Sequence, residues 1–80
     1  MDDLETIKKR IKLYHVGDVP IHIVTKGDTW INGYVIKVFD DYFEVIDRHH
    51  GEVPVFYTDI HVLEFFRGDY STLKKKEDIK

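Results

Sequence analysis

The sequence predicts a mostly β domain, in which an N-terminal α-helix precedes a strongly bent, five-stranded antiparallel sheet. Apolar residues recur at helical spacing only near the N-terminus. From Pro20 onward, short runs rich in β-branched and aromatic residues take over, and glycine, aspartate and proline separate them. Aromatic residues make up 14% of the 80 residues, which favours a packed, β-rich fold over a disordered chain.

The helix is expected over residues 2–14, with a charged outer face. Asp2 or Asp3 can cap its N-terminus, and Gly17 can end it in the left-handed conformation. The stripe that should face the core is made of residues three or four positions apart: Leu4, Ile7, Ile11 and Tyr14.

Turn residues divide the rest of the chain into five strands. Gly33 lies inside the long second run, where a missing side chain permits a sharp bend or the close approach of another backbone. Thr58 and Asp59 form a link too short for an ordinary hairpin, so we expect the last two strands to diverge and to leave open edges. The expected strands are 21–25, 29–39, 42–47, 53–57 and 60–66, which places the domain at residues 1–66 and a charged C-terminal tail, frayed or briefly helical, at 67–80.

The chain is short for a self-sufficient core, because a domain of this size buries only about 60% of the surface that its unfolded chain exposes. Cysteine is absent and the five histidines are scattered, so we expect neither a disulfide nor a metal or other cofactor, although symmetry in an oligomer could bring one histidine from each subunit around an axis. Several strands are apolar on both faces, which indicates a second covering surface. We therefore predict a homo-oligomeric ring of about five to seven subunits, in which the fourth strand of one copy pairs with the fifth strand of the next. The expected interface residues are Val53, Val55, Tyr57, Val62 and Phe65.

The net charge of −3 is unevenly distributed along the chain. In residues 13–66, three basic residues oppose nine acidic ones, whereas both ends of the chain are slightly basic. A central domain this acidic is not typical of a generic phosphate binder. The acidic first residues do not resemble a secretory signal, and no apolar stretch is long enough to cross a bilayer. We expect a cytoplasmic protein without a membrane partner.

The order of these elements resembles the Sm-like family, which includes bacterial Hfq, over residues 2–66. The best local match is Ile31–Val35 followed by Phe39–Val45. It is similar to the family's first motif, in which a glycine in the second strand precedes Asp, any residue, an aromatic or His, an apolar residue and Asn. The resemblance implies an SH3-like open barrel that forms rings and has an RNA-binding or RNA-chaperone role. By that alignment Asp40 braces the loop by accepting backbone hydrogen bonds, and Tyr42 stacks on a nucleobase, which contributes about 1–3 kcal/mol per base.

Three positions depart from the family pattern. The spacing from Gly33 to Asp40 is one residue longer, which a β-bulge can absorb. Glu44 stands where the family has its base-reading Asn, and a carboxylate accepts hydrogen bonds but cannot donate them. The second motif, Arg-Gly or Lys-His in the family, is replaced by Tyr57–Asp59, which contains no cation.

Each candidate RNA contact has a plainer interpretation. Tyr42 can pack at the barrel rim, and Arg48 and His49 can form a solvated hairpin tip. The helix lysines can be a solvated face, although a ring would repeat them into the best phosphate-binding patch. The candidate RNA-binding residues are Tyr42, Glu44, Arg48, His49, Lys8, Lys9 and Lys12.

Three functions are compatible with these features. The first is a ring that binds single-stranded RNA, and the second is an oligomeric structural or protein-interaction scaffold that has lost RNA binding. The third is a monomeric SH3-like or Tudor-like module that binds a peptide through Trp30 and Tyr34. We find no catalytic constellation, since no nucleophile has a recognisable elbow and no glycine-rich phosphate loop opens a helix.

Overall fold

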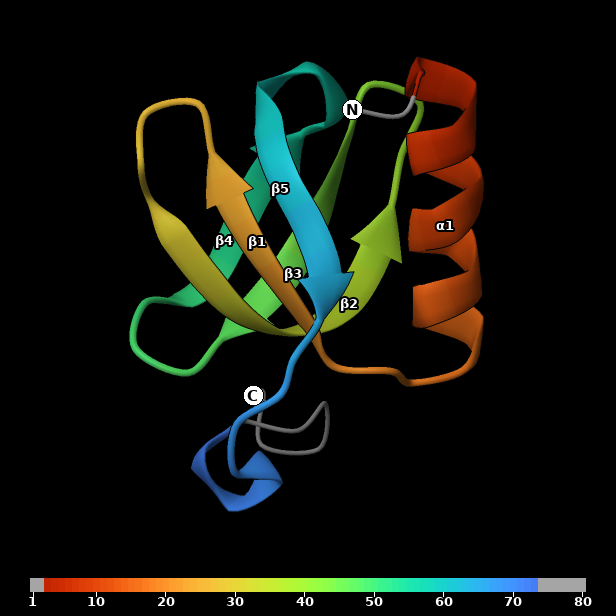
Figure 1. Ribbon diagram of the computed structural model, residues 1–80. Coiled ribbons are helices and arrows are strands. Elements are labelled where there is room, and N and C mark those ends of the chain that lie inside the picture. The colour runs from red at the N-terminus through yellow and green to blue at the C-terminus, as the bar shows by residue number, and fades with distance from the viewer. Residues whose placement is uncertain (1–2, 74–80) are drawn as a thin grey trace.

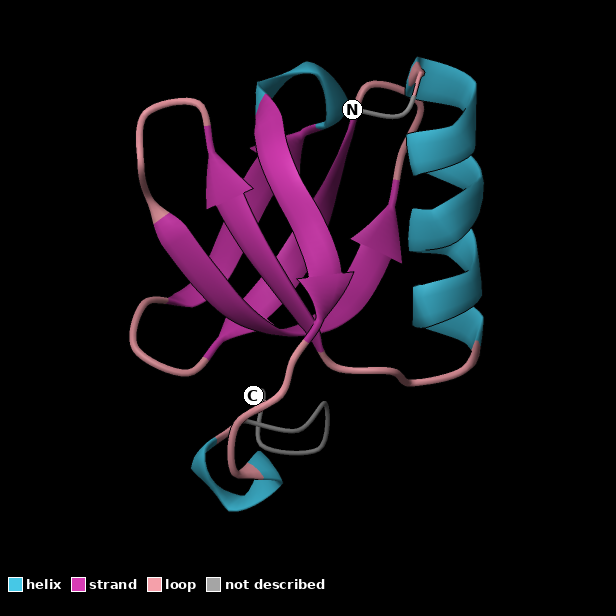
Figure 2. Ribbon diagram, in the orientation of Figure 1, coloured by secondary structure: helices cyan, strands magenta, loops and turns pink. Residues whose placement is uncertain are grey.

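The computed structural model describes residues 3–73. A single α-helix precedes five antiparallel strands, and two short 3₁₀ helices follow the fourth and fifth strands (Figures 1 and 2). The fold class predicted from the sequence is therefore confirmed. The elements are α1 (Leu4–Val16), β1 (Ile21–Thr25), β2 (Trp30–Val38), β3 (Tyr42–Asp47), β4 (Gly51–Phe56), η1 (Tyr57–Asp59), β5 (Ile60–Phe65) and η2 (Tyr70–Thr72).

The strands form one sheet in the order β4-β3-β2-β1-β5. The two edges are β4 and β5, so the predicted divergence of the last two strands is confirmed. The link between them is the single 3₁₀ turn Tyr57–Asp59. Pro54 lies in β4, an edge strand, where its missing N–H is tolerated.

Gly33 allows β2 and β3 to approach closely. A Cβ atom at this position would overlap the carbonyl oxygen of Ile46 on β3, so a side chain cannot be accommodated without moving the main chain. The pairing of β2 with β3 also shifts register between Val35 and Lys37. This bulge absorbs the extra residue between Gly33 and Asp40, as the departure from the family motif predicted.

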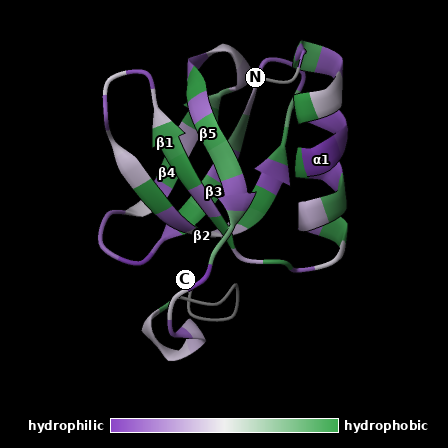
Figure 3. Cartoon of the chain, viewed as in Figure 1, coloured by the Kyte–Doolittle hydropathy of each residue, from purple (hydrophilic) through white to green (hydrophobic). Residues whose placement is uncertain are grey.

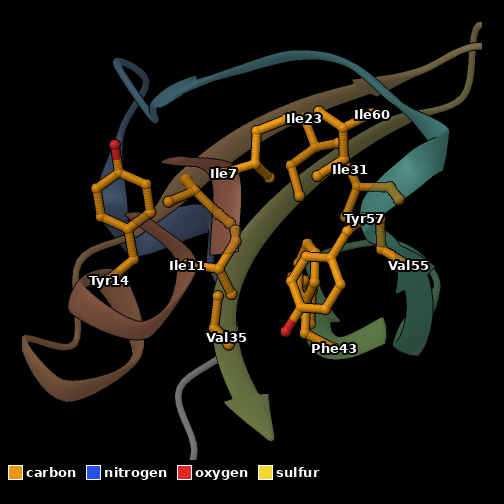
Figure 4. Close-up of a cluster of buried hydrophobic side chains, with 12 residues drawn as sticks. Ile7, Ile11, Tyr14, Ile23, Ile31, Val35, Phe43, Val55, Tyr57 and Ile60 are labelled. Atoms are coloured by element: carbon orange, nitrogen blue, oxygen red, sulfur yellow. The ribbon is translucent and has the colours of Figure 1, made fainter. Parts of the chain in front are cut away.

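The core lies between α1 and the inner face of the bent sheet (Figure 4). Hydrophobic residues follow the strands, whereas the loops at the strand ends are mostly hydrophilic (Figure 3). The helix contributes three of its four predicted core residues, and the fourth, Leu4, is 42% exposed. Arg10 fastens the helix to the sheet, because its guanidinium donates to the Tyr14 hydroxyl at 3.0 Å and to the Leu63 carbonyl on β5 at 2.9 Å. The core residues are Ile7, Ile11, Tyr14, Ile21, Ile23, Ile31, Val35, Phe43, Val45, Val55, Tyr57 and Ile60.

The N-terminal cap of α1 is as predicted, but the left-handed residue at its C-terminal end is not. Asp3 is the N-cap and accepts from the Thr6 N–H at 2.9 Å, as predicted for one of the two aspartates. Gly17, however, has φ −85°, and the left-handed residue is Asp18, with φ 52°. The Gly17 N–H still bonds to the Leu13 carbonyl and so continues the helical turn, and the reversal follows one residue later. Aspartate tolerates this conformation better than most residues.

The beginning of the predicted tail takes the briefly helical of the two predicted forms, and it is packed against the domain. The side chains of Phe66 and Leu73 are buried, and Asp69 caps the short η2 turn by accepting from the Ser71 N–H at 2.9 Å. The remainder of the predicted tail, residues 74–80, and the first two residues of the chain lie outside the described residues. Within residues 3–73, the single α-helix is neither long nor apolar enough to cross a membrane.

Candidate functional site: an aromatic groove between the helix and the sheet

A groove of about 340 Å³ opens where three segments meet. The N-terminal half of α1 forms one wall, the β2–β3 loop forms the second, and the junction of β4 with η1 forms the third. These segments are far apart in the sequence, and the fold brings them together near the start of the helix (Figure 1). The lining residues are Leu4, Lys8, Asp40, Asp41, Phe56, Tyr57 and Thr58.

Tyr57 contacts the other two walls of the groove, the β2–β3 loop and α1. Its side chain is only 2% exposed, and its hydroxyl donates to the Phe39 carbonyl at 2.9 Å. Its main-chain N–H reaches the Asp41 carbonyl at 3.4 Å, and the Lys8 ammonium lies 5.5 Å from the ring centroid. Burial, and after it the charge of Asp40, raises the pKa of Tyr57, so the hydroxyl stays protonated and keeps donating.

Three aromatic rings, Phe39, Tyr42 and Phe56, form a continuous surface beside the groove, which we call the aromatic ladder. The Phe39 and Tyr42 rings are stacked with centroids 4.7 Å apart and an angle of 24° between their planes. The Tyr42 and Phe56 rings are 5.6 Å apart and tilted by 50°. Tyr42 and Phe56 are register partners on β3 and β4, so both point away from the core. Most of the exposed ring surface belongs to Phe39 and Phe56, which are 43% and 54% exposed, whereas Tyr42 is half-buried between them.

The groove carries charges of both signs. Lys8 is its cation, and Asp40 and Asp41 are its anions. Among the described residues, none donates a hydrogen bond to the Asp40 carboxylate, so the bracing role implied by the family resemblance is not observed. The loop is held instead by Tyr57, whose hydroxyl donates to the Phe39 carbonyl and whose main-chain N–H donates to the Asp41 carbonyl. Both carboxylates are exposed and free to accept from a ligand.

A different acid, Asp47, organises the far end of β3. Its carboxylate is 1% exposed and accepts from the main-chain N–H groups of Asn32, His49 and His50 at 2.7, 2.8 and 2.9 Å. The ring Nδ1 of His50 is also 2.9 Å from this carboxylate. Burial raises the pKa of Asp47, but the hydrogen bonds from these backbone groups and from the His50 ring outweigh it and leave the pKa below its ordinary value. In the sequence, Asp47 is only the last residue of the expected strand 42–47.

Arg48 and His49 do not join the groove. They follow β3, and Arg48, six residues beyond Tyr42, lies about 20 Å from it at a rise of about 3.3 Å per residue. The Arg48 guanidinium lies 5.3 Å from the centroid of the Phe66 ring and donates to the Thr72 hydroxyl at 3.1 Å. Arg48 therefore holds the C-terminal turn against the sheet, and His49 is exposed at the hairpin tip.

The other candidate contacts lie around the groove rather than in it. Lys9 and Lys12 are exposed on α1, and only Lys8 of the three predicted lysines lines the groove. Glu44 is half-buried two residues after Tyr42 and lies opposite Pro54 in the sheet. The structure thus brings Lys8, Asp40 and Tyr42 to one place.

The predicted interface residues fall into two groups. Val53 and Val62 are half-buried on the two edge strands, and Phe65 is 55% exposed. Val55 and Tyr57 are 3% and 2% exposed, because their side chains belong to the chain's own core. Any contact of these two positions with a neighbouring subunit is therefore limited to the main chain.

Sequence reasoning did not select Phe39, Asp41 or Phe56 as site residues. Strand alternation around the buried Val55 places Phe56 on the opposite face, and a large apolar residue on that face was the available signal. Asp41 had no comparable signal, since an acid in a turn is usually only solvated. Within residues 3–73, histidine, aspartate and glutamate side chains nowhere gather in the groups of three that a metal site requires.

Comparison with known proteins supports the fold alone. No protein-family model matches the sequence, and no curated protein matches it. Among solved structures, the chain is similar to an Hfq protein from Anabaena sp., with a TM-score of 0.63 and 17% sequence identity. The match covers 80% of this chain and 100% of that one. The N-terminal helix and five-stranded antiparallel sheet are thus the Sm-like fold of Hfq.

Proposed function

We propose that the protein is a cytoplasmic, homo-oligomeric Sm-like ring that binds single-stranded RNA, with a binding rather than a catalytic role. The observation that carries this proposal is the aromatic ladder beside a groove that contains Lys8. Exposed rings stack on bases of any sequence and contribute about 1–3 kcal/mol per base. The similarity of the fold to Hfq supports the same class of ligand.

The ring itself follows from the two open edges. Pairing of β4 in one subunit with β5 in the next is a head-to-tail contact, which closes into a ring when the rotation per subunit allows it. It covers both edge strands, which are otherwise free to pair with unrelated chains. Val53, Val62 and Phe65 are the side chains that we expect in this interface, and about five to seven subunits remain our prediction.

The RNA contacts that we propose are of two kinds. Phe39, Tyr42 and Phe56 provide stacking surface, and Lys9 and Lys12 meet phosphates outside the groove. Because the groove itself holds more acids than cations, we expect stacking to contribute more than phosphate contacts. The affinity should therefore fall less steeply with salt than it does for a basic RNA-binding surface.

The test is the mass in solution by light scattering, followed by anisotropy titrations of short labelled RNA at low and moderate salt. Phe56→Ala removes an exposed ring, so it should weaken binding without unfolding the chain. Tyr42→Ala should weaken it as well. The matched control is Tyr70→Ala, which removes an exposed ring on the C-terminal turn, away from the groove. Equal loss in all three variants would contradict a base-stacking role for the ladder.

The second candidate is a protein-interaction scaffold without RNA binding. It is favoured by Asp40 and Asp41 in the groove, and by Thr58 and Asp59 where the family carries a cation. A stable ring that ignores RNA in these titrations would favour the scaffold. A monomer would favour the peptide-binding module, for which Trp30, 65% exposed, is the best anchor.

A further inference from the structure

We propose that the groove accepts a guanine base, an inference that rests on the proposed RNA-binding function and names the base that the site selects. The Lys8 ammonium and the Asp40 and Asp41 carboxylates line one groove, and Phe56 lends it an exposed ring. The volume of about 340 Å³ is at the small end of ligand sites and is large enough for a base.

The β2–β3 loop, which carries both acids of the groove, is attached to the groove wall through Tyr57. The Tyr57 hydroxyl holds the main chain just before Asp40, and the Tyr57 N–H holds the carbonyl of Asp41. The Lys8 ammonium lies over the same tyrosine ring at 5.5 Å. The main chain on both sides of Asp40 is therefore bonded to one buried residue, which lowers the cost of ordering the two carboxylates on binding.

Only guanine has a base edge that matches this set. Its Watson–Crick edge presents one acceptor, O6, beside two adjacent donors, N1–H and N2–H₂. One carboxylate can accept from both donors at once, and the ammonium can donate to O6. Uracil offers a single N–H between two carbonyl oxygens, which a carboxylate repels. Adenine and cytosine each place an acceptor beside their amino group, so neither can form the paired contact.

The same charges keep phosphate out of the groove. Among the described residues that line the groove, two carboxylates outnumber one ammonium, and a phosphodiester next to them is repelled. The base therefore enters the groove while the backbone stays outside it, where Lys9 and Lys12 are exposed. The groove residues thus select the base, whereas Lys9 and Lys12 position the RNA through its phosphates.

The experiment compares three labelled RNA pentamers that differ only at the central base: guanosine, uridine or inosine in a uridine pentamer. Guanosine should lower the Kd by about 5- to 150-fold relative to uridine, the range for one paired base contact. Inosine lacks the N2 amino group and should lose most of that gain. Equal affinities for the three pentamers would overturn the guanine proposal while leaving RNA binding in place.

Variants then locate the contact. Asp40→Asn combined with Asp41→Asn should bring the guanosine-to-uridine ratio close to one, and the single variants identify the acceptor. Both acids are exposed, so circular dichroism should confirm an intact fold. Lys8→Met should also reduce the ratio, whereas the matched Lys9→Met should weaken all pentamers alike and leave the ratio unchanged. A ratio that survives in the double variant would refute the assignment.

Titrations with GMP and UMP distinguish recognition of a free nucleotide from recognition of a base within RNA. They also distinguish a failure of the guanine proposal from a failure of the RNA-binding proposal. Preference for GMP over UMP, lost in the double variant, would show that the base alone is recognised. If GMP binds but no pentamer does, the guanine site stands and the RNA function falls. If neither GMP nor any pentamer binds, both are wrong.

Discussion

Asp47→Asn is the substitution that should destabilise the fold most clearly. The amide keeps one carbonyl oxygen, which can still accept from the Asn32 N–H. The other oxygen becomes an NH₂ group that faces the N–H groups of His49 and His50, so two backbone donors lose their acceptor in a site that is 1% exposed. A hydrogen bond to a charged group contributes about 1.5–3 kcal/mol. Losing two should lower the free energy of unfolding by about 3 kcal/mol or more.

The pH dependence of this loss provides a second check. Because the pKa of Asp47 is lower in the folded state than its ordinary value of 3.8, the native state favours the ionised form. Its contribution to stability is complete above that value and disappears as the pH falls through the lowered pKa. The difference between Asp47→Asn and the unsubstituted chain should therefore be largest near neutral pH and shrink below about pH 3.8.

The assay is urea unfolding followed by circular dichroism at several pH values and one fixed protein concentration, because self-association would add concentration-dependent stability. A loss of about 3 kcal/mol corresponds to a fall in Tm of about 12 °C or more for a domain of this size. Asp69→Asn is the matched control, since it changes an exposed capping carboxylate and should have a much smaller effect. A loss below about 1 kcal/mol, or one that is the same at pH 3 and pH 7, would refute the role assigned to Asp47.

Three further substitutions test other parts of the fold. Gly33→Ala should destabilise the chain by about 1–3 kcal/mol in urea unfolding, because a Cβ atom forces β2 and β3 apart; an unchanged midpoint would contradict the close approach. Tyr57→Phe should lower stability by about 1 kcal/mol, since the Phe39 carbonyl loses its donor, and should weaken RNA binding through a looser groove wall. Arg48→Met should speed hydrogen exchange in the C-terminal turn while changing global stability by less than about 1 kcal/mol and leaving RNA affinity unchanged; a large loss of RNA affinity would restore Arg48 as a contact.

The fold could be predicted from the sequence because its signals are local. Apolar spacing near the N-terminus identified the helix, and alternation and turn residues identified all five strands to within about two residues at each end. The Gly33 contact and the bulge near Ile36 were both anticipated, since a glycine inside a strand permits close approach of a neighbouring backbone and an extra residue in one strand must bulge out of the ladder. The short Tyr57–Asp59 link also predicted that β4 and β5 separate.

Local signals were less reliable at the end of the helix and in the tail. The left-handed position moved from Gly17 to Asp18, because the helical hydrogen bonds continued for one more residue. The segment after Phe66 packs instead of fraying, since its contacts with Arg48 come from a part of the chain that sequence spacing does not relate to it.

The site was decided by the tertiary structure. Lys8, Asp40 and Phe56 belong to a helix, a loop and an edge strand, and nothing in their sequence separation indicates that they line one groove. Conversely, the sequence left Arg48 available as an RNA contact, but in the structure its guanidinium donates to the Thr72 hydroxyl of the C-terminal turn. The sequence alone determined where the helix and the five strands lie, because the periodicity of helices and strands is set by neighbouring residues. Which charges and rings meet at a surface depends on how distant segments pack, and that is settled only when the sheet bends around its core.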